Sequence, residues 1–546
     1  SNWPVVYTIF DDKRIYVGET TNADMRMRQH LASDEKKNLK QLNVIIHDDF
    51  NKSACLDLES HLIKYFAADD KYLVMNGNSG ISESDYFQRD LYRKSFDEIF
   101  EQLREAGLLT RSIPDIVNSD LFKYSPFKAL NTDQAVAIEG ILELLFADIS
   151  KGENQPIVVQ GEPGTGKTIV AVYLMKLLAD IKFSNVDDAR DVDSLFSDFF
   201  QEGYRELLGD FKYALVIPQQ SLRLSLKKVF SRTPGLSPDM VLSTFDVGKF
   251  KQGYFDLLIV DETHRMQQRA NQSSGPNNKK YIDINLKFYG VDDKSKTQLD
   301  WVKFVSKNQI LLLDEAQTVK PADLPRATVE NLARTAREHD SWFKLASQMR
   351  VAGGDDYIEY VTRIFSADPP AAKKSFDNYD FRFFEKFSDL QLVINEKEAS
   401  EKLSRMVAGY AWPWLSKNGN AEFDFEIEGI KCVWNRTDQD WINSLALENE
   451  IGSIHTVQGY DLNYAGVIIG SELGYDSEAG KLIFRRENYH DKKGKENNPT
   501  LGIAYSDADL LEYICNIYRV LFTRGIKGTF VYVCDKQLRA YLSRFI

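Results

Sequence analysis

Residues 157–168 read IVVQGEPGTGKT, and this stretch decides the fold of the chain around it. The β-branched run Ile157–Val159 predicts a strand, and the apolar segment 169–180 predicts a helix. Between them stands the P-loop pattern G-x-x-x-x-G-K-[ST], whose glycines let the backbone turn tightly around phosphates at a helix N-terminus. We therefore expect ATP to be bound here by Gly161, Gly164, Gly166, Lys167 and Thr168.

A second apolar run ends in two acidic residues. Residues 255–262 read FDLLIVDE, which predicts a strand with Asp261 and Glu262 at its carboxyl end, where ligands collect in open α/β sheets. This is a Walker B pattern, in which Asp261 is expected to hold Mg²⁺ through water and Glu262 to activate the attacking water. In the P-loop, Lys167 is expected to reach the β- and γ-phosphates, and the Thr168 hydroxyl to bind the same ion.

Composition limits the class of protein. The 546 residues suggest three to four domains, and the net charge of −13 argues against a surface coated in positive charge, although a local basic groove is enough for nucleic acid. The four cysteines are far apart in the sequence, so reduced thiols rather than zinc ligands are expected. Without an apolar run of about 18 residues or a basic-then-apolar leader, we expect a cytoplasmic protein that contacts no membrane.

The first 81 residues predict a small unit of their own. A hairpin (VVYTIF, turn, IYVGET), a helix, a strand and an amphipathic helix follow one another. Val5-Val6-Tyr7 and Tyr16-Val17-Gly18 stand where the GIY-YIG nuclease family has its two name-giving triplets, and these residues resemble that family over its whole small domain.

This resemblance implies phosphodiester cleavage that depends on Mg²⁺ or Mn²⁺ bound by Glu59. The catalytic residues that it implies are Tyr7, Tyr16, Arg26, His30 and Glu59, with Asn76 matching the asparagine of the closing segment. A tyrosine can orient water, and an arginine can neutralise charge on the pentavalent phosphate. Because Val5-Val6 replaces Gly-Ile in the first triplet, a domain that binds nucleic acid without cutting it stays an alternative.

The remaining chain carries further motifs in a fixed order. LNTDQ (130–134) opens a helix before the P-loop, LSTFDV follows it, and IGSIHTVQG (451–459) and FTRG (522–525) lie near the C-terminus. Together with the P-loop, these stretches resemble superfamily 1 helicase-like ATPases, in particular bacterial domains of unknown function related to the Schlafen C-terminal helicase-like region. The additional nucleotide contacts that this resemblance implies are Gln134 on adenine, Gln317 and Arg350 at the γ-phosphate, and Arg524 as arginine finger.

One assignment within the motor stays open. Residues 309–317 read QILLLDEAQ, so the pair Asp314-Glu315 is an alternative Walker B. The resemblance favours Asp261-Glu262, because that pair comes first and because Gln317 fits the family's γ-phosphate sensor.

We therefore predict an α/β chain: a small α+β GIY-YIG domain followed by two RecA-like parallel-sheet lobes with insertions. The predicted divisions are 1–81 for the nuclease domain, 82–129 for a helical connector, 130–330 for the first lobe and 331–546 for the second. Residues 266–300 are polar and are predicted to be a mobile insertion, and residues 471–512 a charged one.

The predicted function is an ATP-dependent nuclease–helicase that acts on nucleic acid, DNA rather than RNA, with a protein partner or self-association as a further possibility. Antiphage defence or restriction is the role suggested by analogy with such fusions. Two alternatives stay open: a translocase whose N-terminal domain does not cut, and an ATP-gated sensor nuclease that does not unwind.

Overall fold

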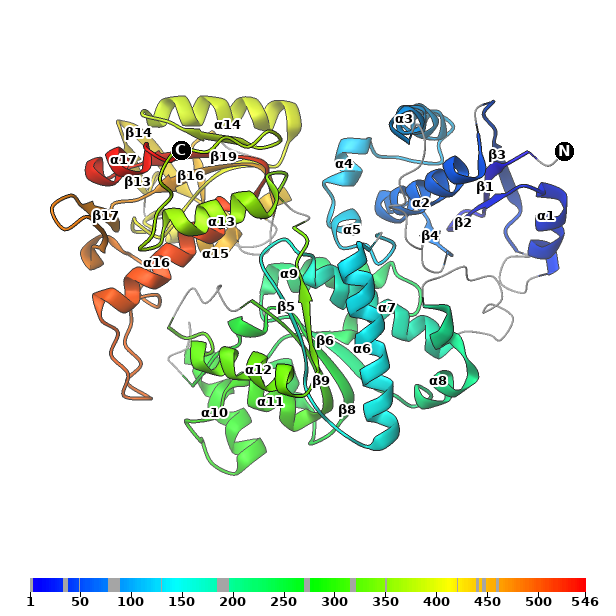
Figure 1. Ribbon diagram of the computed structural model, residues 1–546, viewed down its shortest axis with the longest axis horizontal. Coiled ribbons are helices and arrows are strands. Elements are labelled where there is room, and N and C mark those ends of the chain that lie inside the picture. The colour runs from blue at the N-terminus through cyan, green and yellow to red at the C-terminus, as the bar shows by residue number, and fades with distance from the viewer. Residues whose placement is uncertain are drawn as a thin grey trace.

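The computed structural model folds into three larger sheets and the helices that cover them (Figure 1). The residues that it describes are 3–32, 38–48, 50–76, 89–128, 130–183, 196–269, 275–314, 321–348, 351–419, 421–437, 441–443, 448–457 and 461–546.

The N-terminal unit is a four-stranded sheet in the order β3-β1-β2-β4. Its strands are β1 (Val5–Phe10), β2 (Arg14–Thr20), β3 (Gln41–Ile45) and β4 (Leu73–Val74), and its helices are α1 (Ala23–Ala32) and α2 (Lys52–Asp69). Asp11 closes the β1–β2 turn by accepting the Arg14 backbone N–H at 2.7 Å. Asn51 caps α2, since its side chain accepts the Ala54 N–H at 2.9 Å.

The first motor lobe is a six-stranded parallel sheet in the order β10-β5-β9-β8-β6-β7. Its strands are β5 (Ile157–Gly161), β6 (Tyr213–Val216), β7 (Val241–Leu242), β8 (Phe255–Val260), β9 (Ser306–Leu313) and β10 (Trp342–Leu345). Its helices are α6 (Thr132–Lys151), α7 (Lys167–Phe183), α8 (Glu202–Leu207), α9 (Gln220–Ser231), α10 (Gly275–Tyr289), α11 (Gln298–Val305) and α12 (Arg326–Glu338). The central strands carry continuous apolar runs, at residues 157–159, 257–260 and 310–313, because helices cover both faces of the sheet.

The second lobe is a seven-stranded sheet in the order β11-β19-β16-β12-β15-β14-β13, parallel except for the β13–β14 pair. Its strands are β11 (Asp380–Phe383), β12 (Ser404–Ala408), β13 (Phe425–Ile427), β14 (Ile430–Trp434), β15 (Glu450–Ser453), β16 (Leu462–Ile469) and β19 (Gly525–Val533). Its helices are α13 (Gly354–Ile364), α14 (Phe387–Glu401), α15 (Ile454–Val457), α16 (Asp507–Phe522) and α17 (Lys536–Leu542). The hairpin β17 (Leu473–Asp476) and β18 (Lys481–Phe484) lies in the segment predicted as a charged insertion. The predicted fold class is thereby confirmed.

Two sequence-based expectations about lobe 1 are wrong. The boundary placed after residue 330 falls inside α12, and β10 beyond it pairs with β5, so the first sheet extends to Leu345. The segment 266–300, predicted to be mobile, contains α10 in its described part, and there Tyr281 is fully buried with its ring centroid 4.3 Å from that of Trp301. Its polar composition concealed the apolar side chains that pack against α11.

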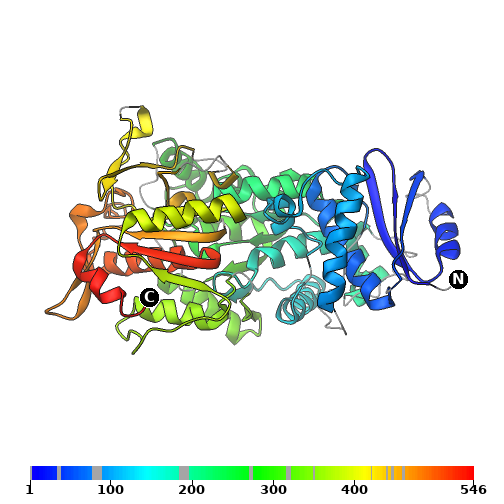
Figure 2. The same cartoon turned by 90° about the horizontal axis from the view of Figure 1, so that it is seen from above.

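One long helix, α3 (Arg89–Glu105), and two short ones, α4 (Ile113–Val117) and α5 (Asp120–Lys123), link the N-terminal unit to the motor. In Figure 1, α4 and α5 lie between the N-terminal unit, lobe 1 and lobe 2, and Figure 2 shows the N-terminal sheet and lobe 2 at opposite ends of the molecule. One continuous apolar core runs from the N-terminal unit through this connector into lobe 1, whereas lobe 2 packs around cores of its own.

Within the part of the chain described above, no helix combines the length and the apolar character needed to cross a bilayer.

Candidate active sites

The first candidate site lies on one face of the N-terminal sheet, around two tyrosines. Tyr7 on β1 and Tyr16 on β2 have ring centroids 6.3 Å apart. Gly18 stands opposite Tyr7 in the hairpin, and a Cβ at position 18 would lie 2.3 Å from Tyr7 Oη, so only glycine leaves room for this ring. Burial and the neighbouring Tyr16 raise the pKa of the Tyr7 phenol, while a hydrogen bond with Arg26 of α1 opposes that rise. Tyr7 is therefore protonated at neutral pH, so its phenol oxygen accepts the hydrogen bond from Arg26 and keeps a proton that it can donate.

Glu59 faces this site from α2. Burial, and after it the charge of Glu19, raise the pKa of Glu59 to about 7, with Lys52 and Arg26 acting in the opposite direction. Asn76 clamps the backbone of β2 from the far end, because it donates to the Val17 carbonyl at 2.7 Å and accepts the Val17 N–H at 3.0 Å. Tyr7, Tyr16, Arg26 and Glu59 are thus brought together as the sequence predicted, and the His30 side chain lies outside the described part of the chain.

Sequence reasoning missed two charged residues here. The Lys52 ammonium pairs with Glu19 Oε1, and Glu19 in turn neighbours Glu59. Their positions held a signal: Glu19 directly follows Gly18, and Lys52 precedes Glu59 by two helical turns on α2.

These residues fit a divalent cation. Among the described residues, the buried Glu19 Oε2 has no hydrogen-bond partner. Burial and the Glu19 charge make ionisation of the neighbouring Glu59 carboxyl unfavourable, which a bound cation would offset. Two carboxyl groups of this kind form a hard oxygen donor set.

The second candidate site is the P-loop at the carboxyl end of β5. Lys167 Nζ donates to the carbonyls of Gly161 at 2.6 Å and Glu162 at 3.0 Å, so the loop surrounds its own lysine. The Thr168 hydroxyl donates to Asp261 Oδ2 at 2.6 Å, which joins the P-loop to the end of β8. A hydroxyl beside a carboxylate fits Mg²⁺, the ion that P-loop NTPases hold with these residue types.

The structure distinguishes between the two acidic pairs that could be the Walker B motif, Asp261-Glu262 and Asp314-Glu315. β9, which ends just before Asp314, lies between β5 and β8, and Asp314 Oδ2 is 4.0 Å from Lys167 Nζ. Both acids therefore approach the P-loop, but the hydrogen bond to Thr168 belongs to Asp261, which favours the Asp261–Glu262 assignment. Residues 315–320, with Gln317, and residues 349–350, with Arg350, lie outside the described residues.

Glu262 is held in a left-handed backbone conformation with φ of 50°. Its carboxylate lies 2.5 Å from Arg265 Nε and 3.3 Å from His264 Nε2. Burial alone would raise the pKa of Glu262, but Arg265 and then His264 hold it well below the ordinary value, whereas burial and the Glu262 charge raise that of Asp261. Glu262 is therefore a carboxylate at neutral pH, as a general base must be, and Arg265 is a site residue that the sequence motif did not reveal.

The position of Gln134 corrects one expectation. Its side chain is fully buried, Nε2 donates to the Thr165 carbonyl at 3.0 Å, and Oε1 accepts the Asn131 N–H at 3.2 Å within a capping box of α6. A Cβ on Gly166 would come within 2.2 Å of this amide. Gln134 thus supports the P-loop backbone instead of facing a base, because its amide oxygen caps α6 and its amide nitrogen holds the Thr165 carbonyl.

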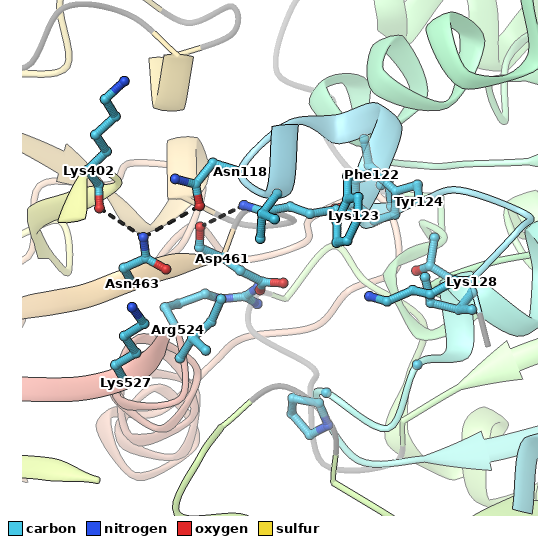
Figure 3. Close-up of a pocket in the computed structure, with 18 of the residues that line it drawn as sticks. Asn118, Phe122, Lys123, Tyr124, Lys128, Lys402, Asp461, Asn463, Arg524 and Lys527 are labelled. Carbon is cyan, nitrogen blue, oxygen red and sulfur yellow. Dashed lines mark hydrogen bonds and ion pairs between the residues drawn. The ribbon is translucent and has the colours of Figure 1, made fainter. Parts of the chain in front are cut away.

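A cavity of about 790 Å³ opens above the P-loop (Figure 3). It is lined by the P-loop, by the α4–α5 connector, and by lobe 2, which contributes Arg524 and Lys527. Arg524 is 3% exposed and its Nη1 lies 4.0 Å from Asp461 Oδ1. The predicted arginine finger therefore shares one cavity with Lys167 and Thr168 although it comes from the other lobe.

A second cavity, of about 700 Å³, lies on lobe 1 beside the first. It is lined by the loop after β6, by Ser243–Phe245 and by α10, with Arg223, Lys249 and Lys280 as cations and Arg265 shared with the nucleotide cavity. Arg223 is anchored, since its Nη1 donates to the Ile217 carbonyl at 3.0 Å.

By its geometry, the chain is a two-lobed P-loop ATPase joined to a small nuclease-type domain. The family comparisons then name both parts, with the GIY-YIG catalytic domain matching residues 4–72 and the Schlafen group 3 DNA/RNA helicase domain matching residues 154–535. The chain belongs to the Schlafen group 3 helicase family and carries a GIY-YIG domain at its N-terminus. The predicted resemblance is confirmed, and the chain is an enzyme with a helicase-like ATPase domain and an endonuclease domain.

The individual proteins and structures that resemble this chain share 25% of its sequence or less. An uncharacterised Saccharomyces cerevisiae protein, YPL245W, is 25% identical over 454 residues, which cover 76% of this chain and 90% of that protein. The arterivirus helicase, nonstructural protein 10, bound to DNA is 10% identical with a TM-score of 0.27, covering 74% of this chain and 67% of that one. Bacteroides Pif1 bound to single-stranded DNA is 10% identical with a TM-score of 0.26, covering 74% and 92%. A bacterial origin for this chain stays a prediction.

Proposed function

We propose that the chain hydrolyses ATP on nucleic acid and that this hydrolysis drives or gates phosphodiester cleavage by the N-terminal domain. The observation that carries the proposal is the nucleotide cavity, which Lys167, Thr168 and Glu262 line together with Arg524 of the opposite lobe. The carboxylate of Glu262 takes a proton from the attacking water, and Arg524 neutralises charge that develops on the phosphates.

In the N-terminal domain, Arg26 and Glu59 carry the proposed chemistry. Arg26 stabilises the pentavalent phosphate, Tyr7 donates a hydrogen bond from its protonated phenol, and Glu59 with Glu19 holds a divalent ion. Such an ion, when bound, lowers the pKa of water and polarises the phosphate. Mg²⁺ suits both sites within this proposal, with Mn²⁺ accepted by the nuclease.

The second cavity supports the nucleic-acid part of the proposal. Four cations and three aspartates line it, and the cations together with the Thr244 hydroxyl are the groups that suit a phosphate backbone. One of these cations, Arg265, is shared with the ATP cavity. Because the net charge is −13, affinity must come from this local groove and fall steeply with salt. We further propose that the substrate is DNA rather than RNA. The proposed biological role is restriction of foreign nucleic acid.

The test uses the full chain with labelled single- and double-stranded DNA and RNA, Mg²⁺ or Mn²⁺, with and without ATP. Cleavage is read on denaturing gels, and phosphate release is followed in parallel. We expect Glu59→Gln to abolish cleavage and keep ATPase, Lys167→Ala to abolish ATPase, and Glu98→Gln, an exposed acid on α3, to change neither.

Three other outcomes would contradict the nuclease site or favour one of the two alternative functions. Cleavage that persists in Glu59→Gln contradicts the nuclease site. Nucleic-acid-stimulated ATPase and strand displacement without cleavage of any substrate would support a translocase with a non-cutting domain. ATP-dependent cleavage without strand displacement would support a gated sensor.

A further inference from the structure

The connector helices α4 and α5 are packed against the helix that bears Glu59. Asp69, the last residue of α2, accepts the backbone N–H groups of Thr110 at 2.9 Å and Arg111 at 2.8 Å, just before α4. The ring of Phe122 on α5 stacks on Tyr65 of α2, with centroids 5.8 Å apart and planes 27° apart. Motion of α4–α5 therefore acts directly on α2.

The same connector is fixed to lobe 1. The Ser225 hydroxyl of α9 donates to Asp120 Oδ2 at the start of α5 at 2.6 Å. Arg232, directly after α9, pairs with Asp70 of the nuclease domain at 2.6 Å. Ile116 and Leu121 of α4 and α5 belong to the apolar core shared by the nuclease domain and lobe 1. Nuclease domain, connector and lobe 1 consequently form one packed body.

Lobe 2 meets the connector through polar groups. Lys402 pairs with Asp115, Asn463 Nδ2 lies 3.5 Å from Asn118 Oδ1, and Lys123 Nζ donates to the Asp461 carbonyl at 3.5 Å. Figure 3 shows Asn118 and Lys123 of the connector beside Asp461 and Asn463 of lobe 2 at the cavity. Polar contacts of this kind, partly exposed and in part long, rearrange more easily than a packed apolar core.

The connector also forms a wall of the nucleotide cavity. Asn118, Phe122 and Lys123 line the same cavity as Lys167 and Arg524. Phe122 thus touches both the cavity and α2, and Asp461 lies between Lys123 and Arg524. The cavity that would hold the nucleotide is thus lined by the connector as well as by both lobes.

We infer that α4–α5 is a third wall of the ATP site and the element through which nucleotide occupancy reaches the nuclease. When lobe 2 closes on ATP, the contacts of Asp115, Asn118 and Lys123 change, and α5 transmits this change through Phe122 to α2 and Glu59. The inference rests on the proposed function, because it requires ATP in the cavity and cleavage at Glu59.

Hydrogen exchange on the full chain tests the inference without a cleavage assay. With the slowly hydrolysed analogue ATPγS, we expect exchange at residues 112–124 to slow by about fivefold or more, the lower end of ordinary allosteric coupling. Lys167→Ala should remove the effect. Protection of the P-loop with unchanged exchange at 112–124 would overturn the inference, whereas an unprotected P-loop would overturn ATP binding itself.

A charge reversal tests the functional consequence. Asp115→Lys should reduce the ATP-dependent change in cleavage rate at least about fivefold, leaving ATP binding intact, and adding Lys402→Asp should restore it. The matched control is Asp356→Lys, which breaks the Asp356–Lys374 pair at 2.9 Å within lobe 2 and should leave the response unchanged. If Asp115→Lys responds to ATP like the unaltered chain, the connector is not the route.

Discussion

At the residue scale, the two sites differ in how they hold their carboxylates. Glu262 is kept ionised by Arg265 and His264, whereas Glu59 is buried beside a second acid and its pKa is raised. The first arrangement suits a general base, and the second suits a ligand that becomes fully ionised when a cation arrives.

Arg265→Ala should shift the acid limb of the ATPase pH–rate profile upward, because Glu262 loses the cation that lowers its pKa. We expect kcat at pH 6 to fall about tenfold for each unit by which the pKa of Glu262 comes to exceed 6, with partial recovery at higher pH. Arg265→Lys, which keeps the charge, should retain most of the activity. A uniform fall at every pH would mean that Arg265 acts on something other than this ionisation.

Glu59→Gln should stabilise the N-terminal domain at pH 8 but not at pH 4. The raised pKa means that the folded state holds its proton more tightly, so stability is lost as pH rises from 4.5 through about 7. The gain at pH 8 in EDTA should reach at most about 3 kcal/mol in chemical denaturation. Equal effects at both pH values, or an effect in the control Glu98→Gln, would contradict the assignment.

Gln134→Ala should weaken ATP and GTP binding alike, by about tenfold, because the amide braces the Thr165 carbonyl and caps α6. Equilibrium titrations with both nucleotides check this, and the exposed Gln155→Ala is the control. Selective loss of ATP over GTP would instead support a base-reading glutamine.

At the element scale, local patterns predicted most of what the structure contains. The hairpin, α2, the P-loop and the β8 strand follow from apolar periodicity and from motifs that occupy a few adjacent residues. Sheet order and the pairing of β10 with β5 depend on contacts between distant segments, which periodicity does not encode. The same limit hid Arg265, Glu19 and Lys52, whose partners become visible only in three dimensions.

The helix α10, which lies in the segment wrongly predicted to be mobile, contributes to a candidate binding surface. Its Lys280 lines the second cavity, while Lys279, adjacent and also exposed, does not. Lys280→Ala should weaken binding of nucleic acid about equally for all sequences and lower the salt slope by about one, with ATP affinity unchanged. Fluorescence anisotropy over a salt series measures both variants, and equal effects of the two substitutions would remove this cavity from the nucleic-acid path.

At the scale of the whole molecule, the distribution of apolar cores divides the chain into two bodies. The nuclease domain and connector share a core with lobe 1, and lobe 2 approaches them across the nucleotide cavity. Such a division makes nucleotide-driven movement of lobe 2 the natural means of controlling the nuclease.

The most direct test of the central claim is the single-turnover cleavage rate of a labelled substrate, measured with and without ATPγS in the full chain and in Lys167→Ala. We expect the nucleotide to change the rate by about fivefold or more in the full chain and to have no effect in Lys167→Ala. A cleavage rate that is the same with and without nucleotide, in a chain shown to bind ATPγS, would contradict it.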